Sequence, residues 1–457
     1  MNILIDTIVA IATPYGMGGI GIIRVSGTEA ISIVDRIFIS LDGCSLLEGK
    51  GYTVRLGIIS IDGEKVDEAI VLLFKAPHSY TGEDVVEIQC HGGPVVLETI
   101  LRSLVNNGAR VAMPGEFTRR AVVNGRISLS EAEGVAKVIS AVSKQGEQAA
   151  FALSKGLLFY KTETLKNQII TLQGAITAYI DFPEEDVEIF SDDEMKDRLL
   201  SIKGELNTLL QSYETGLVIL DGIKTVIVGS PNVGKSTIMN LLAGYDKAIV
   251  TPIAGTTRDI LEHQIRIDGI TLILADTAGI HKTDNPIEKI GIERAYERIK
   301  ESDLVVAVFD NSKNLSLDDY ELMEQIQSEK VIVVVNKVDL ARKLELEEIK
   351  KRFSNIIYVS ANNEIYLETI CEAIKNTVGT KDFSPEVPIL VNERQRAAAS
   401  GALEAIKTSI NALATGLTMD VVYISLDSAL ESLMELSGEN VSDAVLDEVF
   451  SKFCVGK

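Results

Sequence analysis

One octapeptide, GSPNVGKS at residues 229–236, constrains the fold of this chain more than any other stretch. It follows the apolar run TVIV at 225–228 and opens a segment that we expect to be helical over 235–242. Its glycines let backbone N–H groups wrap around phosphate oxygens, and the positive end of the helix favours an anion there. Lys235 supplies a point charge for the outer phosphates and Ser236 a hydroxyl ligand for Mg²⁺. The motif predicts a nucleoside triphosphate site on a parallel α/β sheet.

Three more motifs follow in chain order, each at the carboxyl end of an expected strand. DTAG at 276–279 offers a carboxylate that reaches Mg²⁺ through water and a glycine N–H for the γ-phosphate. NKVD at 336–339 ends in a carboxylate that can accept from N1–H and the exocyclic amine of guanine, which selects GTP over ATP. SAN at 360–362 places a backbone N–H where it can bond the guanine O6. Four motifs in this order predict a GTP site.

The segment between the first two motifs contains GTTRD at 255–259, a candidate loop for sensing the γ-phosphate. After DTAG, Ile280 stands where Ras-like proteins carry a glutamine that orients the attacking water. Glu288, His281 and Arg258 are the nearby candidates for that role. The predicted GTP-contacting residues are Asn232, Val233, Gly234, Lys235, Ser236, Thr237, Thr251, Pro252, Ile253, Ala254, Gly255, Thr256, Thr257, Asp276, Thr277, Ala278, Gly279, Asn336, Lys337, Asp339, Ser360, Ala361 and Asn362.

The rest of the chain divides by its hydrophobic pattern. Residues 6–118 alternate short β-rich runs with helical segments near 29–38 and 95–105, which is typical of an α+β domain. Long stretches with helical spacing fill the regions on either side of the α/β unit. An acidic stretch at 181–197 interrupts the first of them and is interpreted as a solvated loop or helix start.

These patterns predict three domains in four segments. They are an α+β domain at 1–118, a helical domain at 119–219 and 381–457, and an α/β GTPase domain with a doubly wound parallel sheet at 220–380. We expect the GTPase domain to be inserted into the helical one, whose two parts would pack together.

Composition narrows the function classes. The net charge is −22, from 44 Lys plus Arg against 66 Asp plus Glu, which argues against a protein that grips polyanions through a broad basic face. The chain has no Trp, so base-stacking platforms are also disfavoured. Four widely spaced cysteines indicate reduced thiols and no zinc site. We expect a cytoplasmic protein without a membrane span or signal peptide.

Four landmarks lie outside the nucleotide motifs: DTIVAIATPYGMGGIGIIRVSG, SYTGEDVVEIQCHGGP, PGEFTRRAVVNGRISLSEAE and the terminal FCVGK. The α/β unit adds GSPNVGKST, IAGTTRD, DTAGI and IEKIGIERA. With these segments, over nearly its full length, the chain resembles the family of bacterial tRNA modification GTPases called MnmE or TrmE, of the TrmE-Era-EngA-like GTPase group. The resemblance implies a homodimer that joins the flavoprotein MnmG in a heterotetramer. With tRNA as substrate, this complex would add an aminomethyl or carboxymethylaminomethyl group at C5 of the wobble uridine, U34.

The resemblance also implies a folate site in the N-terminal domain, which in this family mediates dimerisation. A tetrahydrofolate derivative, 5-formyl- or 5,10-methylene-tetrahydrofolate, would contact Arg24, Glu87, Arg126 and Lys457. Arg and Lys suit the folate carboxylates, and a carboxylate suits the pterin edge. Arg126 stands where some relatives have lysine, so a planar fork replaces a point donor. Cys454 is a candidate nucleophile or one-carbon carrier.

The resemblance further implies a potassium ion beside the phosphates, which supplies the positive charge that an arginine finger would, with two GTPase domains meeting face to face. By resemblance, K⁺ would be held by Asn232, Thr251, Ile253 and Thr256, and Mg²⁺ by Ser236 and Thr257. Glu288 would orient the attacking water, which makes Glu288 and Lys235 the expected catalytic residues. An alkali cation is chemically sensible where charge develops between the phosphates.

Two other functions fit parts of the sequence. One is a regulatory or ribosome-assembly G protein without tRNA-modifying activity, although no KH-like GxxG domain or basic tail is present. The other is a folate-dependent one-carbon transferase with a vestigial nucleotide domain, which the intact Lys235, Ser236, Thr257 and Asp276 disfavour. Neither explains all of the motifs together.

Overall fold

The computed structural model describes residues 6–181, 190–244, 263–267, 269–274, 299–327, 330–380 and 383–457. The chain divides into two compact units, one of Met1–Ala136 with Leu433–Lys457 and one of Lys137–Ser432. The domain boundaries predicted from the sequence stay a prediction. Short 3₁₀ turns occur at Leu46–Glu48 (η1) and Glu364–Tyr366 (η2).

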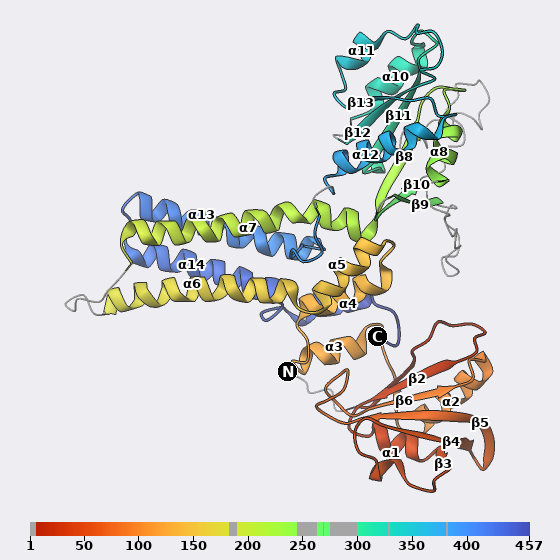
Figure 1. Ribbon diagram of the computed structural model, residues 1–457. Coiled ribbons are helices and arrows are strands. Elements are labelled where there is room, and N and C mark those ends of the chain that lie inside the picture. Colours follow the sequence, from red (N-terminus) through yellow and green to blue (C-terminus); the bar gives the residue numbers. More distant parts are fainter. Residues whose placement is uncertain are drawn as a thin grey trace. The chain divides into compact units, whose positions relative to one another are not determined.

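The first unit is built on a seven-stranded sheet (Figure 1). Its spatial order is β3 (Phe38–Ser40), β4 (Thr53–Ile61), β5 (Glu64–Phe74), β6 (Val85–Cys90), β2 (Gly21–Ser26), β1 (Ile8–Ile11) and β7 (Arg110–Val111). The strands pair antiparallel except for β1 with β7. The five β-rich runs of the sequence are confirmed as β1, β2, β4, β5 and β6, whereas β3 and β7 were not predicted because they are too short to show alternation.

Helices α1 (Ala30–Asp35) and α2 (Pro94–Asn106) cover one face of this sheet. Their apolar side chains pack with every second residue of the strands, as period-two alternation requires. The predicted helix at 29–38 is too long, because α1 ends at Asp35 and Phe38 begins β3. Pairing of 38–40 with β4 outweighs the local helical pattern there.

Three helices from both ends of the chain complete the first unit: α3 (Glu116–Val123), α4 (Leu129–Ser140), whose last residues belong to the second unit, and α15 (Asp443–Ser451). Leu129 and Ala132 share a buried cluster with Phe450 and Phe453. Gly115, in the left-handed region at φ +67°, precedes α3, and a Cβ there would lie 2.7 Å from the Phe450 carbonyl oxygen. This close approach joins segments more than 300 residues apart, and only glycine permits it.

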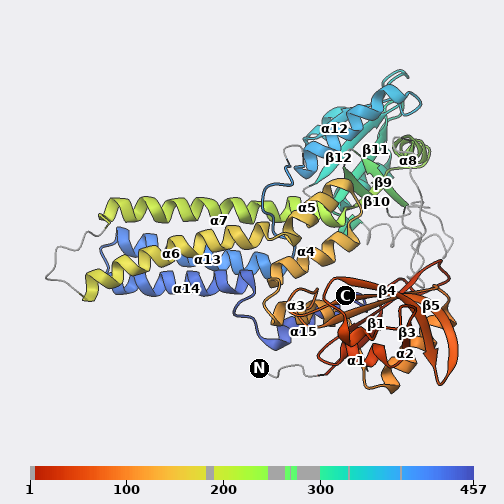
Figure 2. The same cartoon turned by 60° about the horizontal axis from the view of Figure 1, so that its bottom comes forward.

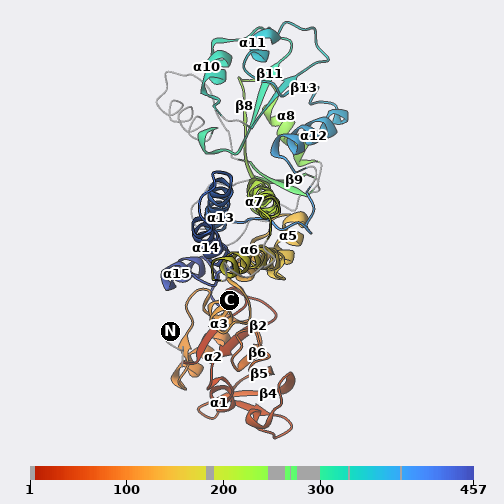
Figure 3. The ribbon, with the colours of Figure 1, turned by 90° about the vertical axis from the view of Figure 1, so that its left-hand side faces the viewer.

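The helical part of the second unit is formed by α5 (Lys144–Ser154), α6 (Leu157–Asp181), α7 (Asp192–Asp221), α13 (Glu393–Ala414) and most of α14 (Met419–Ser437). The last four lie side by side lengthwise, which is plainest in Figure 2 and, viewed along the bundle, in Figure 3. Leu165, Ile169, Leu172 and Ile176 are buried at the spacing of one helix face. The predicted helical regions are confirmed, but the stretch from Met419 to Phe450, whose sequence has helical spacing throughout, breaks at Gly438, where φ is +90°.

The last part of the acidic stretch, residues 192–197, forms the start of α7. Ser191 caps α7 in a capping box with Glu194, and Asp192 and Asp193 occupy the first turn, where carboxylates interact favourably with the helix dipole. Residues 182–189 lie outside the described residues. The interpretation as a helix start therefore holds for the part that the structure describes.

The α/β part of the second unit is a six-stranded sheet. Its spatial order is β13 (Ile356–Tyr358), β12 (Val331–Asn336), β11 (Leu304–Asp310), β8 (Ile223–Val228), β10 (Ile270–Leu274) and β9 (His263–Ile267). Helices α8 (Lys235–Ala243) and α12 (Leu367–Val378) cover one face, and α10 (Leu317–Gln325) and α11 (Leu346–Lys350) cover the other. The doubly wound sheet is confirmed, with one addition: the edge strand β9 was not predicted, and it pairs antiparallel with β10.

Two properties of the chain complete the fold. All four cysteines are free thiols, with Cys44 and Cys454 exposed and Cys90 and Cys371 buried. Among the helices in the described ranges, none combines the length and the apolar character that crossing a membrane would need.

Candidate functional sites

The phosphate loop connects the central strand β8 to α8. Gly234 forms the N-terminal end of α8 in a left-handed conformation, φ +104°, and a Cβ there would lie 2.2 Å from Asn336 Nδ2. Asn232 is also left-handed, at φ +61°, a conformation that asparagine adopts more readily than most residues. The loop therefore has the strand, turn and helix setting that its sequence requires.

Asn336 joins three of the predicted motifs. Its side chain is buried, and Nδ2 donates to the Val233 carbonyl at 2.8 Å while Oδ1 accepts from the Ala361 backbone N–H at 2.9 Å. The phosphate loop, NKVD and SAN are thus tied together by one amide. Parallel pairing of β8, β11, β12 and β13 brings their carboxyl ends to one edge and explains why these segments meet.

A cavity of about 370 Å³ lies between these motifs. Its lining residues are Asn232, Gly234, Lys235, Ser236, Thr237, Asn336, Lys337, Ser360, Ala361 and Asn362. All ten belong to the predicted GTP-contacting set. Two other predicted residues do not line this cavity. Val233, within the phosphate loop, is buried, and Asp339 is exposed.

Lys235 folds back over its own loop. Its Nζ donates to the carbonyl oxygens of Gly229 at 2.7 Å and Ser230 at 2.9 Å. Burial lowers the pKa of Lys235, and the negative charge of Asp319 opposes that shift. The Lys235 ammonium is thus bound to two backbone carbonyl oxygens of the phosphate loop. Phosphate oxygens of a nucleotide would compete with these carbonyls for the ammonium.

Two buried acids behind the loop were missed by the sequence reasoning. Asp310 ends β11, and its Oδ2 accepts from Lys337 Nζ at 2.6 Å, while the same Nζ donates to the Asn232 carbonyl at 2.7 Å. Asp319 accepts from Ser230 Oγ at 2.5 Å and caps α10 with Ser316. The sequence signal that could have predicted Asp310 is its position, because it stands at the carboxyl end of β11, a strand that lies between β8 and β12.

Other predicted residues lie outside the described residues. They are Thr251, Pro252, Ile253, Ala254, Gly255, Thr256, Thr257, Asp276, Thr277, Ala278, Gly279 and Glu288, together with the alternatives Arg258 and His281. Within the described ranges, no group of three or more His, Cys, Asp or Glu side chains is placed to hold a metal. The Mg²⁺ prediction accordingly depends on Ser236, whose hydroxyl is the type of hard oxygen ligand that Mg²⁺ takes beside substrate phosphates.

The first unit brings together the predicted folate residues from both ends of the chain. Arg24 on β2 pairs with Glu87 on β6, through Nε to Oε1 at 2.9 Å, and its NH1 donates to the Gly456 carbonyl at 3.1 Å. Burial lowers the pKa of Lys457, and the positive charge of Arg24 lowers it further. Arg126 is exposed, and its Nε donates to the Ser79 carbonyl at 3.3 Å.

Two aromatic residues of this site were also missed. The rings of Tyr80 and Phe117 lie 5.2 and 5.7 Å from the Arg24 guanidinium carbon. Cation–π contact restrains the plane of the guanidinium without using its N–H groups. Cys454 is exposed, and its backbone carbonyl accepts from the N–H of Gly115 at 3.4 Å.

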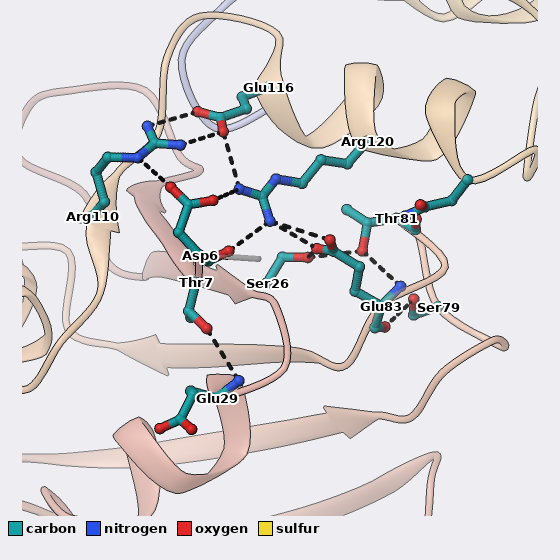
Figure 4. A network of polar contacts seen from close by, with 11 residues as sticks. Asp6, Thr7, Ser26, Glu29, Ser79, Thr81, Glu83, Arg110, Glu116 and Arg120 are labelled. Atoms are coloured by element: carbon teal, nitrogen blue, oxygen red, sulfur yellow. Dashed lines mark hydrogen bonds and ion pairs between the residues drawn. The ribbon is translucent and has the colours of Figure 1, made fainter. Parts of the chain in front are cut away.

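A network of charges in the first unit is centred on the buried Arg120 and Glu116 (Figure 4). The guanidinium of Arg120, 1% exposed, contacts Asp6, Glu83 and Glu116, and Arg110 contacts Asp6 and Glu116 as well. Burial alone would raise the pKa values of Asp6 and Glu116, but hydrogen bonds from the two arginines outweigh it and lower both.

Comparison with known proteins identifies the family. A model described as the MnmE helical domain matches residues 129–454, and one described as the GTP-binding protein TrmE N-terminus matches 7–126. The tRNA modification GTPase MnmE of Lactobacillus acidophilus is 39% identical over 99% of this chain and 98% of its own length. The chain belongs to the MnmE family. MnmE of Thermoanaerobacter pseudethanolicus is 40% identical, over 99% of both chains.

The MnmE assignment covers both candidate sites. The N-terminal match includes Arg24, Glu87 and Arg126, and the helical match extends across the nucleotide motifs. Among solved structures, that of Era from Aquifex aeolicus is 26% identical, covering 40% of this chain and 66% of that chain, with a TM-score of 0.27. The MnmE family and the multidomain architecture predicted from the sequence are confirmed.

Proposed function

We propose that this protein hydrolyses GTP to GDP and that, with the flavoprotein MnmG, it adds an aminomethyl or carboxymethylaminomethyl group at C5 of U34 in tRNA. The observation that carries the proposal is the side chain of Asn336, which ties three GTPase motifs around one cavity in a chain of the MnmE family. The net charge of −22 disfavours broad contact with the tRNA backbone, so MnmG would supply most of the electrostatic attraction to the tRNA phosphates.

In the nucleotide site, each predicted side chain has a chemical task. Lys235 would leave the Gly229 and Ser230 carbonyls and bind the β- and γ-phosphates. Ser236 and Thr257 would hold Mg²⁺, which neutralises charge on the transferred phosphoryl group when bound. Glu288 would orient the attacking water. Asp339 would select guanine by accepting from its two donors.

Potassium is proposed as a further activator. Asn232 lines the cavity, its backbone is left-handed, and Lys337 Nζ donates to its carbonyl oxygen. An amide side chain also carries the oxygen type of ligand that K⁺ takes. Thr251, Ile253 and Thr256 would complete the set. GTP turnover should then rise when Na⁺ is replaced by K⁺ at equal ionic strength. Equal rates in the two salts would reject this part of the proposal.

A tetrahydrofolate derivative is the proposed one-carbon donor. Arg24, Arg126 and Lys457 supply positive charge, and Glu87 supplies a carboxylate for the pterin edge. Arg24 and Glu87 pair across two strands, Lys457 lies close enough to feel the charge of Arg24, and Arg126 contacts the Ser79 carbonyl in the segment that carries Tyr80. Calorimetric titration of the full chain with 5-formyltetrahydrofolate tests the site, and absence of binding would remove it from the proposal.

The same face of the sheet supports homodimerisation. The row Ala10, Arg24, Glu87, Leu72 and Val54 runs across five strands on one face. At its β4 end this face is apolar and open: Ile39 on β3, Val54 and Leu56 on β4 and Ile70 on β5 are 40–63% exposed. Exposed apolar patches of this kind mark interaction sites. We propose that a second copy of the chain covers it.

The dimer proposal is tested by Leu56→Glu, since a charge in the patch would have to be buried on association. Sedimentation should show a shift from dimer to monomer at micromolar concentration. Leu317→Glu, at an 80% exposed position of α10, is the matched control and should leave the wild-type mass unchanged. A Leu56→Glu variant as dimeric as the wild type would assign the face to another role.

Reconstitution tests the whole proposal. Purified protein, MnmG, tRNA, GTP and a one-carbon tetrahydrofolate should yield the modified nucleoside, and omission of any one component should abolish it. Undiminished modification of wobble uridine in cells lacking this protein would reject the proposed function and favour a regulatory G protein.

A further inference from the structure

Arg120 gathers acids from three separate segments of the first unit. Its NH1 donates to the Asp6 carbonyl at 2.8 Å and to both Glu83 oxygens at 3.2 Å, and its NH2 donates to Asp6 Oδ1 at 2.7 Å and Glu116 Oε1 at 3.1 Å. Desolvation offsets most of the attraction in a buried ion pair, so such a cluster is a weak source of stability. Its effect is geometric, because it fixes where the three segments lie.

The Glu83 branch of the network fixes a turn at residues 79–83. Ser26 Oγ donates to Glu83 Oε2 at 2.7 Å and lies 2.8 Å from Thr81 Oγ1. Ser79 Oγ donates to the Glu83 carbonyl at 2.5 Å, and the Glu83 N–H donates to Thr81 Oγ1 at 3.2 Å. Figure 4 shows that Arg120 and Ser26 both bond to the Glu83 carboxylate, which belongs to this turn.

This turn carries two contacts to the predicted folate residues. The Tyr80 ring lies 5.2 Å from the Arg24 guanidinium, and its hydroxyl is 2.8 Å from Thr118 Oγ1 on α3. The Ser79 carbonyl accepts from Arg126 Nε. Movement of the turn would therefore displace the partners of both arginines at once.

We propose that Arg120 is a positioning residue for the folate-class site, acting through Glu83 and the 79–83 turn on Arg24 and Arg126. This inference rests on the proposed folate function. It adds that Arg120 fixes the orientation of the two arginines that would bind the ligand. A planar guanidinium recognises carboxylates through a fork whose orientation matters, so a site built from two arginines needs their planes fixed in advance.

The substitution Arg120→Lys separates charge from geometry. The ammonium keeps the charge but cannot reach Asp6, Glu83 and Glu116 with a fixed planar set of donors. We expect affinity for 5-formyltetrahydrofolate to fall about tenfold, the value of one charged hydrogen bond, with GTP turnover unchanged. Arg119→Lys is the matched control, because Arg119 is the neighbour on α3 and its ion pairs among the described residues are with the exposed Asp447 and Asp443, at 3.4 and 3.6 Å.

A double-mutant cycle separates positioning from general stability. If Arg120 acts through Arg24, Arg120→Lys should cost much less in an Arg24→Lys background than in the wild type. A merely structural role would instead give additive losses, and additivity would overturn the proposal.

A milder variant covers the case in which Arg120→Lys does not fold. Tyr80→Phe removes only the hydroxyl contact to Thr118, so folate affinity should fall about threefold while the protein stays folded. Wild-type affinity in this variant and in any folded Arg120→Lys protein would overturn the positioning role alone. No folate binding by the wild type would reject the folate site itself, and this inference with it.

Discussion

The nucleotide site and the folate-class site differ in how far apart along the chain their residues lie. The described nucleotide residues come from three short motifs between Asn232 and Asn362, each directly after a strand of one parallel sheet. Arg24 instead contacts Gly456, which is 432 residues away. The first site follows from strand order, whereas the second exists only when the two ends of the chain meet. Mutations should therefore have local effects in the first site and distributed effects in the second.

The largest effect is expected for Asp339→Asn. An amide cannot accept from both guanine donors, so GTP affinity should fall at least about a hundredfold while preference moves to xanthosine triphosphate. Competition binding with the two nucleotides measures the change. GTP affinity equal to that of the wild type would show that NKVD does not bind the base, and the nucleotide site would no longer be a set of local motifs.

Glu288→Ala separates GTP hydrolysis from GTP binding. Turnover should fall about a hundredfold or more, since positioning of the attacking water is lost, while GTP still binds. Single-turnover hydrolysis and nucleotide affinity are measured on the same preparation. Near-normal hydrolysis would direct attention to His281 and Arg258.

Arg24→Ala should weaken binding of 5-formyltetrahydrofolate by about ten- to a hundredfold, the range for losing charged hydrogen bonds. GTP turnover of the isolated protein should not change. Isothermal titration and a GTPase assay give the two readings. If truncating Lys452–Lys457 left folate affinity intact, the long-range character of this site would be wrong.

Asp310→Asn should have a moderate effect, about tenfold on GTP affinity, because Lys337 loses its carboxylate partner but keeps the Asn232 carbonyl. Titration with a fluorescent GTP analogue measures the affinity. Asp318→Asn, at an exposed position of α10, is the control. An unchanged GTP affinity would confine nucleotide recognition to the motifs that the sequence reveals.

The smallest effect concerns acid stability of the first unit. Asp6 and Glu116 have folded-state pKa values below their ordinary 3.8 and 4.5, so their stabilisation is fully present above those values and is lost as pH falls through the lowered ones. The melting temperature should fall by a few degrees between pH 5 and pH 3 beyond the loss seen for Glu116→Gln. Parallel curves for the two proteins would show that the network does not couple to folding.

Much of this molecule is determined by local sequence. Alternation of apolar residues predicted five of the seven strands in the first unit, and glycine spacing with a preceding apolar run predicted the phosphate loop. The exceptions are instructive: β3 and β7 are held by pairing rather than by their own pattern, and Gly438 divides a segment that looks continuously helical. Local propensity is a weak guide wherever a partner strand or a turn supplies the deciding contact.

The sequence by itself determined the strand ends at which GTP-binding residues stand, because parallel strands carry their carboxyl ends to one edge. It also indicated, through family resemblance, which four residues belong to a folate site. Only the tertiary structure decided that Asp310 restrains Lys337, that Tyr80 and Phe117 flank Arg24, and that Arg120 holds the turn behind them. Each of these contacts joins residues distant in the chain, and no local pattern encodes a contact whose partner is chosen by packing.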